Sequence, residues 1–124
     1  MSDDRKRILV VDDDVMQLNN MKKLLKEFYD VTAVNSGKSC IKFLENHQCD
    51  LIFLDFLMPE ESGEQVFYKL RDNPKTKDIT VVFLTSVTEK KVVVKTLTEL
   101  KPAGYIVKPA SKKDLVNKIM DILG

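Results

Sequence analysis

Five short runs of apolar, largely β-branched residues recur along this chain of 124 residues, and each is followed directly by polar residues. Short continuous apolar runs are typical of strands that are buried on both faces of a parallel sheet. The second run is more mixed than the others, which indicates an edge strand. The predicted strands cover residues 8–11, 31–34, 51–54, 81–84 and 105–107.

Segments with helical spacing of apolar residues separate the predicted strands. Ser36 and Ser111 stand where helix N-caps are expected, with Asp114 three residues after Ser111, and Asn73 followed by Pro74 ends the third helix. Right-handed crossovers between parallel strands then place helices on both faces of one sheet, in three layers. The predicted apolar stripes are Leu18, Met21, Leu25 and Phe28; Cys40, Ile41 and Leu44; Val66, Phe67 and Leu70; Val93, Leu97 and Leu100; and Leu115, Ile119 and Ile122.

Composition points to one domain over residues 1–124, in a soluble cytoplasmic protein. The chain is 44% hydrophobic and 31% charged, and its formal net charge is only +1. A charge balance of this kind lacks the general positive field that drives direct binding to nucleic acid or to membrane surfaces. No apolar stretch approaches the ~20 residues of a membrane span. Cys40 and Cys49, without a wider cysteine framework, are expected to be reduced thiols.

Polar side chains gather where the predicted strands end. Ligands of open parallel sheets bind at this carboxyl edge. Several carboxylates on one edge repel each other, and a cation offsets that cost. Oxygen-only ligands favour a hard ion, and Mg²⁺ fits best because one or two carboxylates, waters and phosphate oxygens usually hold it. The residues after the strands are Asp12, Asp13 and Asp14; Asp55; Thr85 and Ser86; and Lys108 and Pro109.

This set of groups is suited to phosphoryl transfer, in which positioning and charge neutralisation provide most of the catalysis. Asp55 stands alone at its strand end and is the candidate nucleophile. Asp12 and Asp13 are the candidate metal ligands. Lys108 is expected to pair with one phosphoryl oxygen, and Thr85 to hydrogen-bond another.

The same residues resemble the receiver domains of two-component response regulators, of the single-domain chemotaxis type. The matching motifs are Ile-Leu-Val-Val-Asp-Asp at residues 8–13, Asp-Phe-Leu-Met-Pro at 55–59 with Gly63, Leu-Thr-Ser at 84–86, and Tyr-Ile-Val-Lys-Pro at 105–109. All four occur in the right order at the right strand ends, and together they span the chain. The resemblance implies a flavodoxin-like, doubly wound (βα)5 fold with a five-stranded parallel sheet in the order 2-1-3-4-5.

The resemblance also implies a chemistry for the strand-end residues. Asp55 would accept a phosphoryl group from a sensor histidine kinase or a histidine phosphotransfer protein. Mg²⁺ would be held by Asp12, Asp13, Asp55 and the backbone carbonyl of Leu57. The protein would then be a phosphoacceptor, with self-phosphorylation and autodephosphorylation as its only activities, rather than an enzyme.

A switch is implied as well. Thr85 would be drawn toward the phosphoryl group, and Tyr105 would turn into the space that Thr85 leaves. Pro59 would shape the loop after the acceptor, and the bond between Lys108 and Pro109 would be cis. The surface of the fourth and fifth helices and the fifth strand would bind a downstream protein partner, act on an output domain beyond residue 124, or form a phosphorylation-dependent dimer.

Two alternatives remain at this stage. Asp12 and Asp14, separated by one residue after the first strand, imitate the nucleophile and acid of haloacid-dehalogenase-like phosphohydrolases, although Met16 departs from that pattern. The chain is also short for that fold and has no obvious cap segment to exclude water. A degenerate receiver that binds partners without phosphorylation is a weaker alternative, because the acidic residues, Thr85 and Lys108 are all present.

Overall fold

A computed structural model describes residues 5–86 and 90–124, without the side chains of residues 90–93 and 97. Strands and helices alternate along the described chain. The elements are β1 (Arg7–Val11), α1 (Val15–Leu25), β2 (Asp30–Val34), α2 (Gly37–Asn46), β3 (Leu51–Asp55), α3 (Gly63–Asp72), β4 (Thr80–Thr85), α4 (Lys90–Glu99), β5 (Gly104–Val107) and α5 (Lys112–Leu123).

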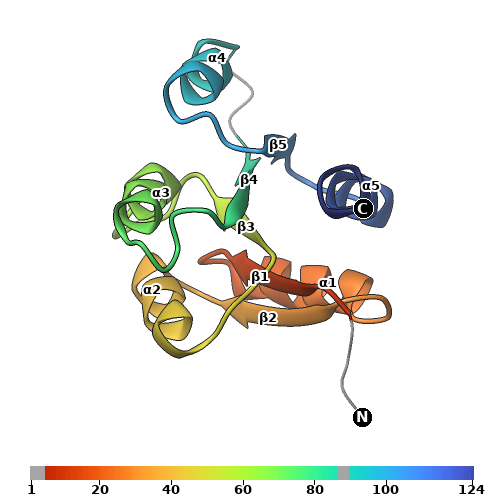
Figure 1. The fold of residues 1–124 in the computed structure, drawn as a ribbon. Helices are drawn as coiled ribbons and strands as arrows, with labels where there is room; N and C mark the ends of the chain where they lie inside the picture. Colours follow the sequence, from red (N-terminus) through yellow and green to blue (C-terminus); the bar gives the residue numbers. More distant parts are fainter. Residues whose placement is uncertain (1–4, 87–89) are drawn as a thin grey trace.

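The strands form one parallel sheet in the order β2-β1-β3-β4-β5, as predicted. Helices α1 and α5 cover one face, while α2, α3 and α4 lie on the side of the other (Figure 1). The order reverses at β1, from which the chain runs outward to β2 and then back to β3. Crevices at such reversals are the usual ligand sites of doubly wound sheets. β2 is only partly buried after its exposed first residue, as an edge strand should be.

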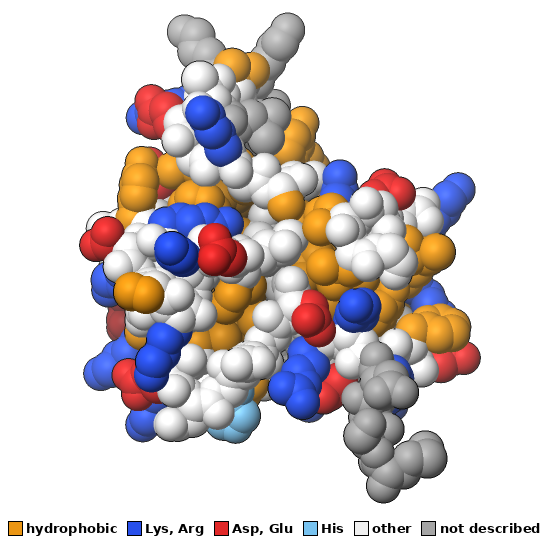
Figure 2. Space-filling view, viewed as in Figure 1, with side chains coloured by type: hydrophobic (Ala, Val, Ile, Leu, Met, Phe, Trp, Pro, Cys, Tyr) orange, Lys and Arg blue, Asp and Glu red, His pale blue; other side chains and the backbone are white. Residues whose placement is uncertain are grey.

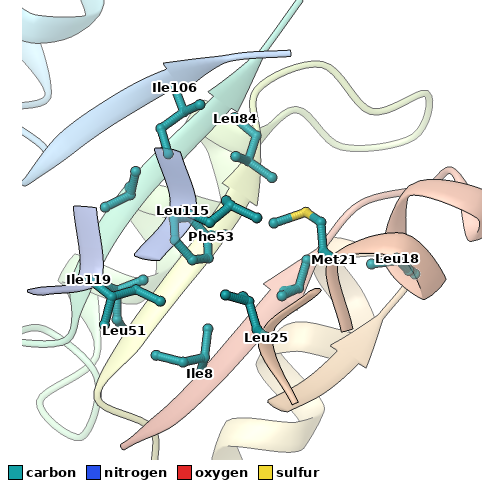
Figure 3. Packing of buried hydrophobic residues seen from close by; sticks show 12 residues of the cluster. Ile8, Leu18, Met21, Leu25, Leu51, Phe53, Leu84, Ile106, Leu115 and Ile119 are labelled. Carbon is teal, nitrogen blue, oxygen red and sulfur yellow. The ribbon is translucent and has the colours of Figure 1, made fainter. Parts of the chain in front are cut away.

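Two hydrophobic clusters, one on each face, hold the layers together. Figure 3 shows the first, in which β1, β3 and β4 pack against α1 and α5 around Phe53 and Leu115. The second packs the opposite face of the same strands against α2 and α3 around Phe67 and Phe83. Alternate residues of each strand therefore enter different clusters, and both faces of the central strands are fully buried.

Side-chain caps set the helix starts. Ser36 caps α2, and Ser111 forms a capping box with α5, as the sequence predicts. Two further caps were not predicted: Asp14 accepts hydrogen bonds from the first turn of α1, and Ser62 forms a capping box with α3. Asn73 is the C-cap of α3, just before Pro74, as expected.

The predicted first helical stripe is wrong at its end. α1 ends at Leu25, so Phe28 lies in the turn before β2 and is 51% exposed. Its ring instead faces the Lys112 ammonium group, 5.2 Å from the ring centroid. The side chains of Val93 and Leu97, predicted to face the core from the fourth helix, lie outside the described residues.

The surface carries charges of both signs. Basic and acidic side chains are interspersed over the face shown in Figure 2, in keeping with the nearly balanced total charge. Cys40 is buried, Cys49 is partly buried, and both are free thiols. In the described part of the chain no helix has the length and apolar character needed to cross a bilayer.

Candidate functional site

Three carboxylates meet at the carboxyl edge of the sheet. Asp12 follows β1 and Asp55 ends β3, and the register of these neighbouring strands pairs Val11 with Leu54 just before them. With Asp13, they place one carboxylate oxygen each within 4.8 Å of one another. Asp12 is fully buried and Asp55 is 4% exposed, whereas Asp13 faces solvent. The cluster therefore has a buried floor and one open side.

Lys108 provides the positive charge of this site. Its Nζ lies 2.7 Å from Asp12 Oδ2 and 3.1 Å from Asp55 Oδ1. Burial lowers the pKa of Lys108, but the two carboxylates outweigh burial and the pKa is raised. The Lys108–Pro109 bond is cis, as expected, and the backbone N–H of Lys108 donates to the Thr85 carbonyl at 2.7 Å.

The pKa of Asp55 is shifted by its surroundings in the cluster. Burial, followed by the charge of Asp12, raises its pKa from 3.8 to about 6, although Lys108 acts in the opposite direction. At neutral pH the carboxyl group is still mainly ionised. It is therefore a carboxylate whose charge is poorly compensated, and a further cation or a neutralising modification would relieve it.

The backbone around Asp55 is held by α3. The N–H of Gly63 donates to the Phe56 carbonyl at 3.0 Å, and the N–H of Phe56 donates to the Leu84 carbonyl at 2.8 Å. A Cβ at Gly63 would overlap the carbonyl oxygen of Asp55. The resemblance included Gly63 only as part of a motif. The structure shows why a side chain is excluded there: the first turn of α3 lies directly on the backbone of Asp55.

The donor set fits Mg²⁺. All three groups are carboxylates, and hard cations prefer oxygen ligands. Asp12 Oδ1 accepts a hydrogen bond from the Asp14 N–H at 2.9 Å. Asp12 Oδ2 contacts Lys108, but it accepts no well-aligned hydrogen bond from any described residue. A buried oxygen in this state is ready to coordinate a cation.

The other predicted residues lie in the β3–α3 loop, at the end of β4 and in β5. Leu57 lies in the loop between β3 and α3 and is 55% exposed. Pro59 lies in the same loop and lines a cavity of about 330 Å³ together with Asp13. Thr85 is buried at the end of β4, two residues after Phe83. Tyr105 pairs with Phe83 and is partly buried against the second cluster.

Asp14 does not join the acidic cluster. Its Oδ1 accepts hydrogen bonds from the backbone N–H groups of Met16 and Gln17, at 2.9 and 3.4 Å. This carboxylate is therefore the N-cap of α1, which argues against the pairing of Asp12 with Asp14 as nucleophile and acid. An Asp directly before an apolar helical stripe is a recognised N-cap signal and would have revealed this role in the sequence.

Sequence reasoning also overlooked Glu61. This residue of the β3–α3 loop is paired with Lys69 of α3 and lies against Gly37 at the start of α2. No local pattern in the sequence marks this contact, because its partners come from two other elements.

Comparison with known proteins agrees with this geometry. Residues 8–120 match the family model of the response regulator receiver domain. The chain belongs to this family. The match runs from β1 into α5, so the whole acidic cluster of this receiver domain lies within it.

Similar proteins come from varied organisms. A probable transcriptional regulator, ycf27, of Cyanidium caldarium is 33% identical over 121 residues, which make up 94% of this receiver domain and 45% of that protein. Response regulator SaeR of Staphylococcus epidermidis is 32% identical over 117 residues, which make up 94% of this chain and 49% of SaeR. This receiver domain thus spans less than half the length of these curated relatives.

Solved structures show the same fold. The signal receiver domain of a signal transduction histidine kinase from Syntrophus aciditrophicus is 31% identical, with a TM-score of 0.85 over 95% of this chain and 89% of that one. Vibrio cholerae chemotaxis protein CheY4 is 20% identical, with a TM-score of 0.87 over 95% of this chain and 98% of that one, and it supports the fold alone.

Proposed function

We propose that this receiver domain accepts a phosphoryl group on Asp55 in a Mg²⁺-dependent reaction. The observation that carries the proposal is the position of Asp55: buried at the end of β3, within the acidic cluster and 3.1 Å from Lys108. Membership of the family supports a role as phosphoacceptor. The donor is a phosphohistidine of a sensor histidine kinase or of a histidine phosphotransfer protein.

In the proposed step, a carboxylate oxygen of Asp55 attacks the phosphorus of the phosphohistidine. The new O–P bond forms as the P–N bond breaks, and the imidazole nitrogen takes up the electron pair and a proton. Lys108 pairs with a phosphoryl oxygen and shields its charge from Asp55 and Asp12. Asp12, Asp13, Asp55 and the Leu57 carbonyl would hold Mg²⁺, which would neutralise the charge of the phosphoryl oxygens.

The proposed response to phosphorylation begins at Thr85. Its hydroxyl donates to a phosphoryl oxygen, and the ring of Tyr105 turns inward toward the space that Thr85 leaves. A change from about 1:99 to 99:1 between two conformations requires ~5.5 kcal/mol of differential binding. Charge-assisted hydrogen bonds contribute ~1.5 to 3 kcal/mol each, so Thr85, Lys108 and one backbone N–H are sufficient.

The output of the switch is a change in protein binding. The surface of α4, β5 and α5 carries Tyr105 and is the proposed contact for a downstream protein, for a further domain of a longer chain, or for a second phosphorylated copy. We place the protein in the cytoplasm, without direct binding to nucleic acid or membranes. Its own chemistry is limited to taking up and losing the phosphoryl group.

Intact-mass spectrometry after incubation with Mg²⁺ and acetyl phosphate tests the proposal. We expect the wild type to gain the mass of one phosphoryl group, mapped to Asp55, and to lose the adduct when Mg²⁺ is chelated during the incubation. Asp55→Asn should gain none. Asp14→Asn is the matched control, because Asn also caps helices and the residue lies outside the acidic cluster.

Two results would contradict the proposal. An adduct mapped to Asp12, with steady hydrolysis of phosphoesters, would identify a phosphohydrolase. A wild type that gains no phosphoryl group from acetyl phosphate or from phosphohistidine donors would identify a binding module that works without phosphorylation.

A further inference from the structure

Glu61 connects three elements near the acidic cluster. It lies in the loop between β3 and α3, and its Oε2 is ion-paired with Nζ of Lys69 on α3. Its other oxygen faces α2: a methyl group at Gly37 would lie 2.5 Å from Glu61 Oε1. The side chain of Glu61 is only 20% exposed. After burial itself, the charge of Glu61 also helps to raise the pKa of the Cys40 thiol in α2 to about 12.

The contact with α2 is electrostatically favourable. Gly37 is the first residue of α2, where the helix dipole and unsatisfied N–H groups attract negative charge. Ser36 already caps this helix through the N–H of Ser39, so Glu61 adds a charged group to a turn that is hydrogen-bonded. Gly37 leaves room for the carboxylate, because a Cβ there would overlap both the Glu61 carboxylate and the Val66 side chain.

The loop that Glu61 anchors is the one that borders the acidic cluster. Met58, Pro59 and Glu60 line the cavity of about 330 Å³ that Asp13 and Lys38 also line. Leu57, the proposed carbonyl ligand, lies in the same loop. The hydrogen bonds of Phe56 hold its first residue, and the capping box of Ser62 holds its last. Between them, Met58 packs against the second hydrophobic cluster, and Glu61 adds a charged contact with the start of α2.

From this arrangement we propose that Glu61 is a positioning residue for the divalent cation: it fixes the β3–α3 loop against α2 and α3, so that the loop needs no ordering when the cation binds. The inference rests on the proposed Mg²⁺-dependent function. Preorganisation of this kind strengthens binding because less conformational entropy is lost.

Isothermal titration calorimetry with MgCl2 on the unphosphorylated chain tests this role. Glu61→Gln keeps the size of the side chain but removes its charge, and we expect its Kd for Mg²⁺ to rise roughly threefold to tenfold, a change equivalent to ~0.7 to 1.4 kcal/mol. Lys69→Met leaves Glu61 intact but removes its ion pair, and it should raise the Kd by a smaller factor. Glu60→Gln is the matched control, since it removes the same charge from the neighbouring, exposed loop position.

Hydrogen exchange and kinetics add independent measurements. The backbone amides of residues 57, 58, 60 and 61 and of the first turn of α2 should exchange faster in Glu61→Gln than in Glu60→Gln. The acetyl phosphate reaction should need more Mg²⁺ for half its maximal rate, yet reach the wild-type rate at saturating Mg²⁺. General unfolding would instead lower the maximal rate.

The outcomes separate the two proposals. If the wild type binds Mg²⁺ but Glu61→Gln matches Glu60→Gln in Kd and in loop exchange, the role of Glu61 is refuted and the proposed function stands. If Glu61→Gln is destabilised, the Kd for Mg²⁺ and the loop exchange of Lys69→Met are compared with those of Glu60→Gln instead. Equal values again refute the role of Glu61. If the wild type binds no Mg²⁺, the proposed function fails, and the role of Glu61 fails with it.

Discussion

Replacing Asp55, the proposed acceptor, by Asn should make the metal-free protein more stable at neutral pH. Asn imitates the protonated carboxyl group in shape and removes its charge. In the folded protein that charge is buried beside Asp12, which raises the pKa of Asp55 from 3.8 to about 6. Lys108 keeps its contact of 2.7 Å with Asp12 in the variant, so the substitution leaves no buried ammonium group unpaired.

The sign and the magnitude follow from the pKa. The folded state binds the Asp55 proton more tightly than the unfolded state, so the free energy of unfolding falls as the pH rises from about 4 to 6. Above about pH 6 the full cost of ionisation is present. A rise of about two pKa units corresponds to at most ~3 kcal/mol. We expect the free energy of unfolding of Asp55→Asn to exceed that of the wild type by about 1 to 3 kcal/mol at pH 7.5 and to equal it near pH 4.

Urea unfolding followed by circular dichroism, in EDTA at pH 7.5 and near pH 4, measures both values. The gain at pH 7.5 corresponds to a rise of roughly 4 to 12 °C in Tm for a domain of this size. Asp13→Asn serves as control, because Asp13 is exposed and its charge should contribute much less. The reasoning is refuted if Asp55→Asn is no more stable than the wild type at pH 7.5, or if its advantage grows as the pH falls.

Three further predictions concern the cation and the backbone. Mg²⁺ at about 100 times its Kd should stabilise the wild type by ~2.7 kcal/mol and Asp55→Asn by much less, as thermal unfolding with and without EDTA would show. Equal stabilisation of the two proteins would mean that the ion binds away from Asp55. Gly63→Ala should lose ~1 to 3 kcal/mol of stability in urea unfolding and slow the proposed phosphorylation of Asp55, because the methyl group would overlap the Asp55 carbonyl oxygen. Gly104→Ala is its control, since the atoms nearest to a methyl group there belong to the flexible end of Lys118, and similar losses of stability for both variants would contradict the argument. Lys101, whose φ is 49°, should be replaceable by Gly with a gain of ~0.5 to 1 kcal/mol, and a loss of stability in Lys101→Gly would show that its conformation is not strained.

Much of the site could be predicted because its signals are local. The apolar runs identify the strands, and the first polar residue after each run is the one that reaches the carboxyl edge. Asp12 and Asp55 are distant in sequence, but both follow buried parallel strands. The rule that such strands end at the same edge was enough to place them together.

The failures concern interactions whose partners lie elsewhere in the fold. Phe28 continues the apolar spacing of the first helix, yet α1 ends at Leu25 before the chain enters β2, and the exposed ring faces the ammonium group of Lys112 of α5. Glu61 reads as one of several charges in an acidic loop, because its contacts with Gly37 and Lys69 require α2 and α3 to be in place. Competing local and tertiary demands of this kind are not visible in a single sequence.

The sequence by itself determined the fold class, the strand ends and the residue types of the site, since hydrophobic periodicity and strand-end polarity depend only on neighbours along the chain. The tertiary structure alone decided how those groups share their charge. It buries Asp12 fully, sets Lys108 between Asp12 and Asp55, and assigns Asp14 to a helix cap. Burial and distances between side chains of different strands govern the pKa of Asp55, and these exist only once the sheet has formed.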